Sequence, residues 1–176
     1  MVQILVAYSS RSGNTEKLAR AVAEFEASAF NTYIGPEKPE LLMIASSACN
    51  LYGKEAISLL GLEDRVGLLK LGTTWPLPPD LMQNYLSMSD RILVVEEVIP
   101  FLEENVKIIA AELASEIGPK TFFAKRDGTF PGTNEMNPDL VMAALAEILE
   151  IPYEPTPPAY RRRAQDLTQS GAPGRD

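Results

Sequence analysis

The chain has 176 residues, an apolar fraction of 45% and a formal net charge of −8. This length favours one domain with a substantial core, and the acidic balance argues against a broad nucleic-acid-binding surface. The chain contains no histidine and one cysteine, Cys49, which excludes within one chain a protein-ligated iron–sulfur cluster, a Cys/His zinc site, an intrachain disulfide and a Ser-His-Asp or Cys-His catalytic pair.

Residues 2–8, VQILVAY, are nearly continuous in apolar character and predict a buried parallel strand. A hydroxyl-rich turn follows at residues 9–15, and then a helix with Leu18, Val22 and Phe25 on one face. Free backbone N–H groups and the positive end of the helix dipole meet in such a turn. The turn is therefore a candidate site for an anion such as a phosphate.

This turn resembles the phosphate loop of the flavodoxin family, which has the pattern Ser/Thr, any residue, Ser/Thr, Gly, any residue, Thr. The pattern falls on six consecutive residues: Ser10, Arg11, Ser12, Gly13, Asn14 and Thr15. The resemblance covers about the first 23 residues and implies FMN binding, with Tyr52 or Trp75 able to stack on the flavin. A capped strand-to-helix turn without a ligand remains the alternative interpretation.

Residues 26–40 are rich in proline and turn residues and predict a connector. Residues 40–46 predict the next strand, residues 46–50 a loop that can hold an anion, and residues 52–60 a helix. Cys49 lies in this loop. We expect it to be a small, partly buried residue rather than a nucleophile, because no base is available to activate it.

Two short apolar runs, at residues 66–71 and 92–95, predict strands that are buried on both faces. Each run is followed by a loop and a helical pattern. Residues 120–125 predict a last strand, and Asn137 is expected to cap a final helix that runs through Leu149.

Glu96 and Glu97 follow the strand at residues 92–95, at the edge where open α/β sheets bind ligands. Adjacent residues of a strand point to opposite faces, so these carboxylates do not form an acid–base pair on one substrate. We expect a structural or domain-contact role for both.

These elements predict an α/β fold, a three-layer α/β/α sandwich with a mainly parallel sheet of about five strands. Residues 2–8 are expected either beside the strand at residues 40–46 or at the edge of the sheet. Residues 1–151 are expected to form a single domain, and the proline-rich residues 152–176 a mobile tail. No apolar run is long enough to span a bilayer, which favours a cytoplasmic protein without membrane contact.

Several motifs recur in order along the chain: LLKLGTTWPLP, VVEE and PFLEENV, with FEASAFNTYIGPEKPELLMIASSACNLYGKEAISLLGL upstream and GTNEMNPDLVMAAL downstream. They resemble the α subunit of indolepyruvate ferredoxin oxidoreductase, a thiamine-diphosphate-dependent 2-oxoacid oxidoreductase. The resemblance covers about residues 24–176 and concerns the transketolase C-terminal-like middle domain. The two resemblances together imply a chain that joins a flavodoxin-like opening unit, residues 1–23, to this domain. The oxidoreductase resemblance also leads us to expect a glycine near Ser47, where the chain has none.

This resemblance implies conversion of aryl 2-oxoacids to acyl-CoA with reduction of ferredoxin, using thiamine diphosphate, magnesium and iron–sulfur clusters. The triplet Arg126-Asp127-Gly128 departs from the thiamine-diphosphate motif Gly-Asp-Gly, so we expect these cofactors only on domains outside this sequence. We assign no catalytic residue and no metal ligand. The chain is then a non-cofactor domain, inactive alone, that packs against the thiamine-binding domains or the β subunit and reaches ferredoxin through the full enzyme.

Two other functions remain open. One is an FMN-binding electron-transfer module that uses residues 10–15. The other is a ligand-free interaction scaffold, which predicts an exposed apolar contact surface around Trp75, Leu77 and Phe101.

Overall fold

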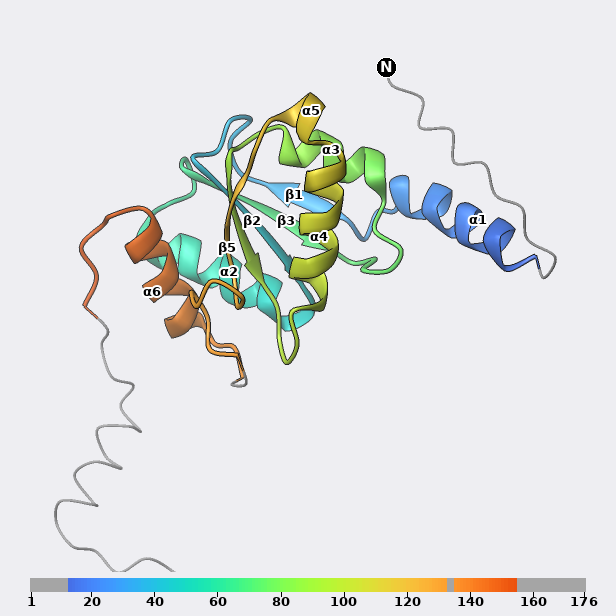
Figure 1. The fold of residues 1–176 in the computed structure, drawn as a ribbon. Coiled ribbons are helices and arrows are strands. Elements are labelled where there is room, and N and C mark those ends of the chain that lie inside the picture. Colours follow the sequence, from blue (N-terminus) through green and yellow to red (C-terminus); the bar gives the residue numbers. More distant parts are fainter. Residues whose placement is uncertain (1–12, 133–134, 155–176) are drawn as a thin grey trace, which may run out of the picture.

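The computed structural model describes residues 13–132 and 135–154, in which one mixed sheet lies between helices (Figure 1). The strands are β1 (Thr32–Ile34), β2 (Leu41–Ser46), β3 (Val66–Leu71), β4 (Arg91–Val95) and β5 (Thr121–Phe123). The helices are α1 (Asn14–Glu26), α2 (Ser47–Leu60), α3 (Pro79–Leu86), α4 (Phe101–Glu112), α5 (Ala114–Ile117) and α6 (Pro138–Ile148).

The strands lie across the sheet in the order β1-β3-β2-β4-β5. The central strand β2 pairs in parallel with β3 and β4, and β5 pairs in parallel with β4. At the other edge, β1 pairs antiparallel with β3. The chain leaves β2 toward β3 and later returns to the other side of β2 as β4. The gap between β2 and β4 is therefore the topological switch point, where sheets of this kind bind ligands.

Alternate side chains of β2 fill two separate cores. Leu41 and Met43 pack with residues of α2 and α6, whereas Leu42 and Ile44 pack with residues of α3 and α4. All four side chains are fully buried. Continuous apolar runs predict this pattern for strands that are covered on both faces, and the two cores confirm the three-layer α/β/α sandwich.

Local sequence signals set several helix boundaries. Pro79 opens α3, and Gly61 ends α2 with a φ of 64°, which glycine adopts without a Cβ clash. The Asn137 side chain accepts a hydrogen bond from the backbone N–H of Leu140 at 3.0 Å, at the start of α6. The expected cap of the last helix is thus confirmed.

The expected connector at residues 26–40 contains a strand, β1, that the sequence pattern did not predict. Tyr33 of this strand lies against Gly67 of β3, where an added Cβ atom would be only 2.2 Å from the tyrosine hydroxyl. The same hydroxyl donates a hydrogen bond to the carbonyl of Pro36 at 2.5 Å. The missing side chain of Gly67 therefore makes room for β1 to pair at this edge.

Both sides of β2 are occupied, by β3 and β4. The strand expected at residues 2–8, either beside β2 or at the edge of the sheet, lies outside the described residues and stays a prediction.

Helix α1 differs from the other long helices because none of its residues is buried. Its last residue, Glu26, accepts hydrogen bonds from the backbone N–H groups of Asp80 and Leu81 at the start of α3, both at 2.8 Å. The rest of α1 projects away from the sheet (Figure 1). The helix is thus attached to the body of the molecule through its C-terminal end.

Candidate functional site

A crevice of about 220 Å³ lies at the topological switch point. Ser46 and Ser47, where β2 passes into α2, form one side, and Glu96 and Glu97 after β4 form another. The apolar part of the lining includes Phe101 at the start of α4. Most small-molecule pockets are larger, roughly 300–1,000 Å³, so this crevice suits a small group or part of a partner.

The β2–α2 junction is tighter than the sequence predicts. Helix α2 begins at Ser47, directly after β2, so the expected loop at residues 46–50 does not form. Ser47 has a φ of 50°, in the left-handed region that costs a non-glycine residue about 1–3 kcal/mol. This is the position near which the family resemblance leads us to expect a glycine. Within the described part of the chain, no side chain caps the start of α2.

The β4–α4 junction is closed by a carboxylate of the chain itself. Glu96 is 6% exposed, and its two oxygens accept hydrogen bonds from the backbone N–H groups of Leu102 (2.6 Å) and Glu103 (2.9 Å). Burial raises the pKa of Glu96, although these two N–H groups act in the opposite direction. Glu96 therefore fills the place where the N-terminus of α4 would hold an external anion.

A second buried carboxylate extends this arrangement to the far side of α4. Glu103 is completely buried and accepts hydrogen bonds from the backbone N–H groups of Lys125 (3.2 Å) and Arg126 (3.1 Å), just after β5. It also forms an ion pair with Lys107, one turn further along α4. The first turn of α4 is thus connected to the ends of both β4 and β5.

Glu97 is exposed, whereas its neighbour Glu96 is buried. The two carboxylates therefore point in different directions, one into the protein and one to its surface, as expected for adjacent residues at the end of a strand. The hydrogen bonds of Glu96 confirm its expected structural role. A domain-contact role for Glu97 stays a prediction. The sequence did not reveal that Glu96 binds the start of α4, because no short motif marks a contact across the intervening loop.

Cys49 is 1% exposed in the first turn of α2, more buried than expected. Burial, with a smaller contribution from the nearby charge of Glu97, raises the pKa of the thiol to about 11. The thiol is therefore protonated at neutral pH, and a thiolate nucleophile is not formed there.

Apolar side chains are exposed beside the crevice, and we call them the loop patch: Trp75, Val98, Ile99 and Phe101. Their exposed fractions are 60%, 70%, 62% and 41%, respectively. The rings of Trp75 and Phe101 meet edge to face at 5.9 Å. Leu77, expected in this surface, is only 6% exposed and packs in the core beneath α3 and α4, so its assignment to the surface is wrong.

The position of Val98 in the loop patch is supported from below. Val98 has a φ of 62°, which is rare for a β-branched residue. The Nζ atom of Lys125, a residue that is 8% exposed, donates a hydrogen bond to the carbonyl of Val98 at 3.3 Å. The loop between β4 and α4 is thus held at both its base and its apex.

Within residues 13–132 and 135–154, no cluster of acidic, histidine or cysteine side chains is arranged to hold a metal ion. In the same ranges no helix is long and apolar enough to cross a membrane.

The expected phosphate loop is only partly described. Ser10, Arg11 and Ser12 lie outside the described residues. Gly13 precedes α1 with a φ of 69°, and Asn14 and Thr15 are the first residues of that helix. They lie on α1 and not at the switch point, and FMN binding there stays a prediction.

Comparison with known proteins relates the chain to one group. No protein-family model matches it. It is 36% identical over 118 residues, 67% of this chain, to the indolepyruvate oxidoreductase subunit IorA of Methanothermobacter thermautotrophicus. The IorA subunits of Pyrococcus horikoshii and Methanothermobacter marburgensis are 40% identical over 95 residues and 32% identical over 137 residues, which are 54% and 77% of this chain. This chain is a homologue of IorA.

The chain spans a small part of its IorA relatives, namely 14%, 18% and 21% of the subunits from P. horikoshii, M. thermautotrophicus and M. marburgensis. Solved structures with a similar fold include a transketolase and a ferredoxin-dependent oxidoreductase. A split-gene transketolase, an inactive beta4 tetramer, matches 69% of this chain and 42% of its own with a TM-score of 0.51 and 17% identity. The 2-oxoglutarate:ferredoxin oxidoreductase of Magnetococcus marinus matches 80% of this chain and 24% of its own chain, with a TM-score of 0.53 and 14% identity. These matches confirm the expected transketolase-like architecture.

Proposed function

We propose that this chain is the non-cofactor domain of an indolepyruvate oxidoreductase-like assembly. Its homology to IorA supports the type of assembly. The observation that carries the non-cofactor role is Glu96, whose buried carboxylate occupies the N-terminus of α4 at the switch point. An anionic cofactor group would bind at such a helix start in a sheet of this kind. In this chain the place is already filled.

In this proposal, oxidation of an aryl 2-oxoacid to an acyl-CoA, with reduction of ferredoxin, takes place on other domains. Thiamine diphosphate, magnesium and iron–sulfur clusters bind there. Residues 24–151 supply the transketolase C-terminal-like unit within a single domain of residues 1–151, and residues 152–176 form the tail that follows it.

The loop patch is the surface that we assign to contact with the cofactor-binding domains or the partner subunit. Three of its side chains, Trp75, Val98 and Ile99, are each at least 60% exposed. Clustered apolar exposure of this kind is typical of a protein–protein contact, and tryptophan is often among the residues that contribute most to binding. The hydrogen bond from Lys125 to Val98 also holds the loop between β4 and α4 in place, so binding costs little conformational entropy in this loop.

A binding measurement tests this assignment. The full chain is immobilised, and the remaining domains of an IorA subunit, produced without the matching segment, are added with and without the partner subunit of the oxidoreductase. We expect saturable binding that Trp75→Ser weakens about tenfold or more. Ile108→Ser is the matched control, because Ile108 is 56% exposed on the outer surface of α4. Absence of binding, or equal effects of both substitutions, contradicts the proposal.

An activity measurement tests the non-cofactor role separately. Thiamine diphosphate, magnesium and an aryl 2-oxoacid are added to the purified chain, and release of carbon dioxide is followed. We expect no release above the rate without protein. Turnover by the chain alone overturns the proposal.

We also propose, as a second function, that residues 10–15 bind the phosphate of FMN. Two described features support it: the left-handed conformation of Gly13 and a start of α1 that no described side chain caps. A titration that follows quenching of flavin fluorescence should saturate, and Gly13→Asp should abolish the quenching because it adds a negative charge. Unchanged fluorescence with the native chain refutes this function.

A further inference from the structure

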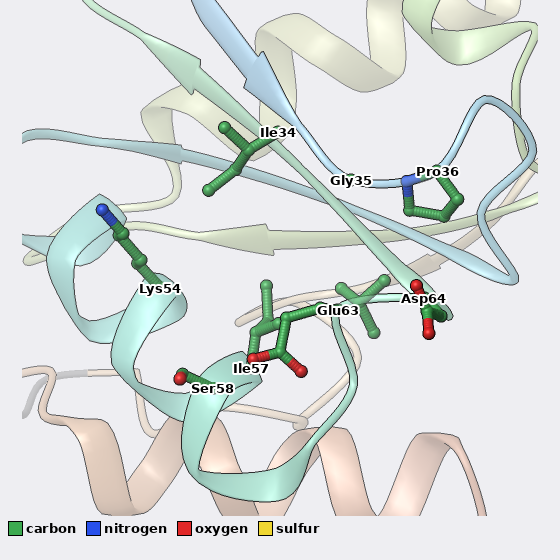
Figure 2. A pocket seen from close by; sticks show the side chains of 9 residues that line it. Ile34, Gly35, Pro36, Lys54, Ile57, Ser58, Glu63 and Asp64 are labelled. Carbon is green, nitrogen blue, oxygen red and sulfur yellow. The ribbon is translucent and has the colours of Figure 1, made fainter.

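A groove of about 450 Å³ lies at the β1 edge of the sheet, on the face that α2 covers (Figure 2). Its apolar floor is formed by Ile57 of α2 and Val66 of β3, which are nearly completely buried, and by Ile34 of β1, which is 50% exposed. In a three-layer sandwich this is the place of one more helix beside α2. The groove therefore has the position and the apolar floor of a helix-binding site.

The two ends of the groove carry opposite charges. Lys54 of α2 lies at one end, and Glu63 and Asp64, which follow α2, lie toward the other (Figure 2). All three side chains are exposed. Within the described part of the chain, none of them forms an ion pair. A helix that lies in the groove in one direction can satisfy both ends.

Helix α1 has an apolar stripe that the described fold covers only in part. Leu18, Val22 and Phe25 are spaced four and three residues apart, which places them on one face of the helix. Val22 and Phe25 are half-buried, and Leu18 is 39% exposed. On one flank of the stripe lie Lys17 and Glu24, two turns apart.

The groove of the same chain is out of reach of this stripe. The carboxylate of Glu26 holds the C-terminal end of α1 on the backbone N–H groups of Asp80 and Leu81. These belong to α3, which covers the opposite face of the sheet from α2. Helix α1 continues from there away from the sheet (Figure 1). A stripe and a groove that do not meet within one copy can meet between two copies.

We propose that α1 of a second copy of this chain lies in the groove, antiparallel to α2. In this orientation Lys17 faces Glu63 and Asp64, and Glu24 faces Lys54. The charges match in sign and in order along the groove: Lys17 and Glu24 lie about 10 Å apart along α1, and Lys54 and the acidic pair lie toward opposite ends of the groove (Figure 2). Reciprocal exchange of α1 closes a two-fold dimer by helix swapping.

Charge reversal across the two copies tests the proposal. Sedimentation velocity over a range of concentrations should show a dimer of the full chain. Lys17→Glu, or Glu63→Lys combined with Asp64→Lys, should each weaken the dimer at least about tenfold, because either change sets like charges against each other twice. A mixture of the two variants should form a heterodimer of native strength, because both of its contacts again join opposite charges.

Arg20→Glu is the matched control for Lys17→Glu. Arg20 lies on the outer face of α1, paired with Glu16 at 3.2 Å, and both side chains are highly exposed. The substitution changes the net charge equally but should leave the dimer intact. A chain that stays monomeric at high micromolar concentration overturns the proposal and leaves the stripe and groove to partners of other sequence. Failure of the mixed variants to associate also overturns it.

The apolar contact is tested by Leu18→Asp and Ile34→Asp, one in the stripe and one in the groove. Each should abolish the dimer, whereas Ile108→Asp, at an exposed isoleucine of α4, should not. Circular dichroism checks that all three variants remain folded. A dimer that resists both substitutions uses another surface and contradicts the proposal. Binding of IorA domains through the loop patch is unaffected by either outcome.

Discussion

The two strand-to-helix junctions at the switch point solve the same structural problem in different ways. At the β2–α2 junction the helix starts at once, at a strained Ser47, and no described side chain caps it. At the β4–α4 junction a loop intervenes, and Glu96 reaches back to bind the first backbone N–H groups of α4. Equivalent positions in a parallel sheet thus give one open helix start and one closed start. The closed junction should contribute the larger share of local stability.

The largest effect is expected at Glu103, which extends the closed junction to β5. Glu103→Ala removes the acceptor of the Lys125 and Arg126 N–H groups and the partner of Lys107. Because these donors are left unpaired near the core, we expect a loss of about 3 kcal/mol in the free energy of unfolding. Urea denaturation measures it. Glu104→Ala, on the exposed side of the same turn, is the control. If Glu103→Ala lowers the free energy of unfolding no more than Glu104→Ala does, the buried carboxylate does not stabilise this junction.

A somewhat smaller effect is expected at Glu96 itself. Glu96→Ala leaves the N–H groups of Leu102 and Glu103 without an acceptor, which should cost about 2 kcal/mol. Glu97→Ala, at the exposed neighbour, should change the free energy of unfolding by less than about 0.5 kcal/mol. Similar losses for the two adjacent carboxylates would remove the contrast between the junctions.

The open junction should respond in the opposite direction. Ser47→Gly relieves the left-handed backbone at the start of α2 and should stabilise the chain by about 1 kcal/mol or less. Ser58→Gly, in the interior of the same helix, should destabilise it by about 0.5–1 kcal/mol. Thermal unfolding compares the two variants. A destabilising Ser47→Gly would mean that the positive φ of Ser47 carries no strain.

The smallest effect concerns pH. Burial raises the pKa of Glu96, so between its unfolded and folded pKa values the native state binds a proton that the unfolded state releases. The contribution of Glu96 to stability therefore increases as the pH falls through the folded pKa toward the unfolded value. Subtracting the pH profile of Glu96→Gln from that of the native chain isolates this contribution. A difference profile of the opposite slope would show that the two backbone N–H groups outweigh burial.

The sequence predicted those features that depend on nearby residues. Continuous apolar runs indicated strands covered on both faces, and Asn137 marked a helix start through its side chain, which caps α6. Strand β1 was missed because its pairing depends on the space above Gly67, which a linear pattern does not show. Leu77 was misplaced because the loop turns its side chain back into the core beneath α3.

The sequence placed Glu96 and Glu97 at the ligand-binding edge of the sheet and predicted that they point in opposite directions. It did not predict the switch point, because that depends on the order of the strands, and the predicted site was residues 10–15. The contact between Glu96 and the start of α4 depends on the path of the loop that contains Val98. That path is set by tertiary contacts such as the hydrogen bond from Lys125.

The two buried carboxylates also have a consequence for local opening of the chain. Glu96 and Glu103 connect the end of β4, the first turn of α4 and the residues after β5 through four backbone hydrogen bonds. The backbone amides of Leu102, Glu103, Lys125 and Arg126 should therefore exchange with deuterium at similar rates, as one cooperative unit, although they are distant in sequence. The amides at the start of α2, which lack such a connection, should exchange independently and sooner.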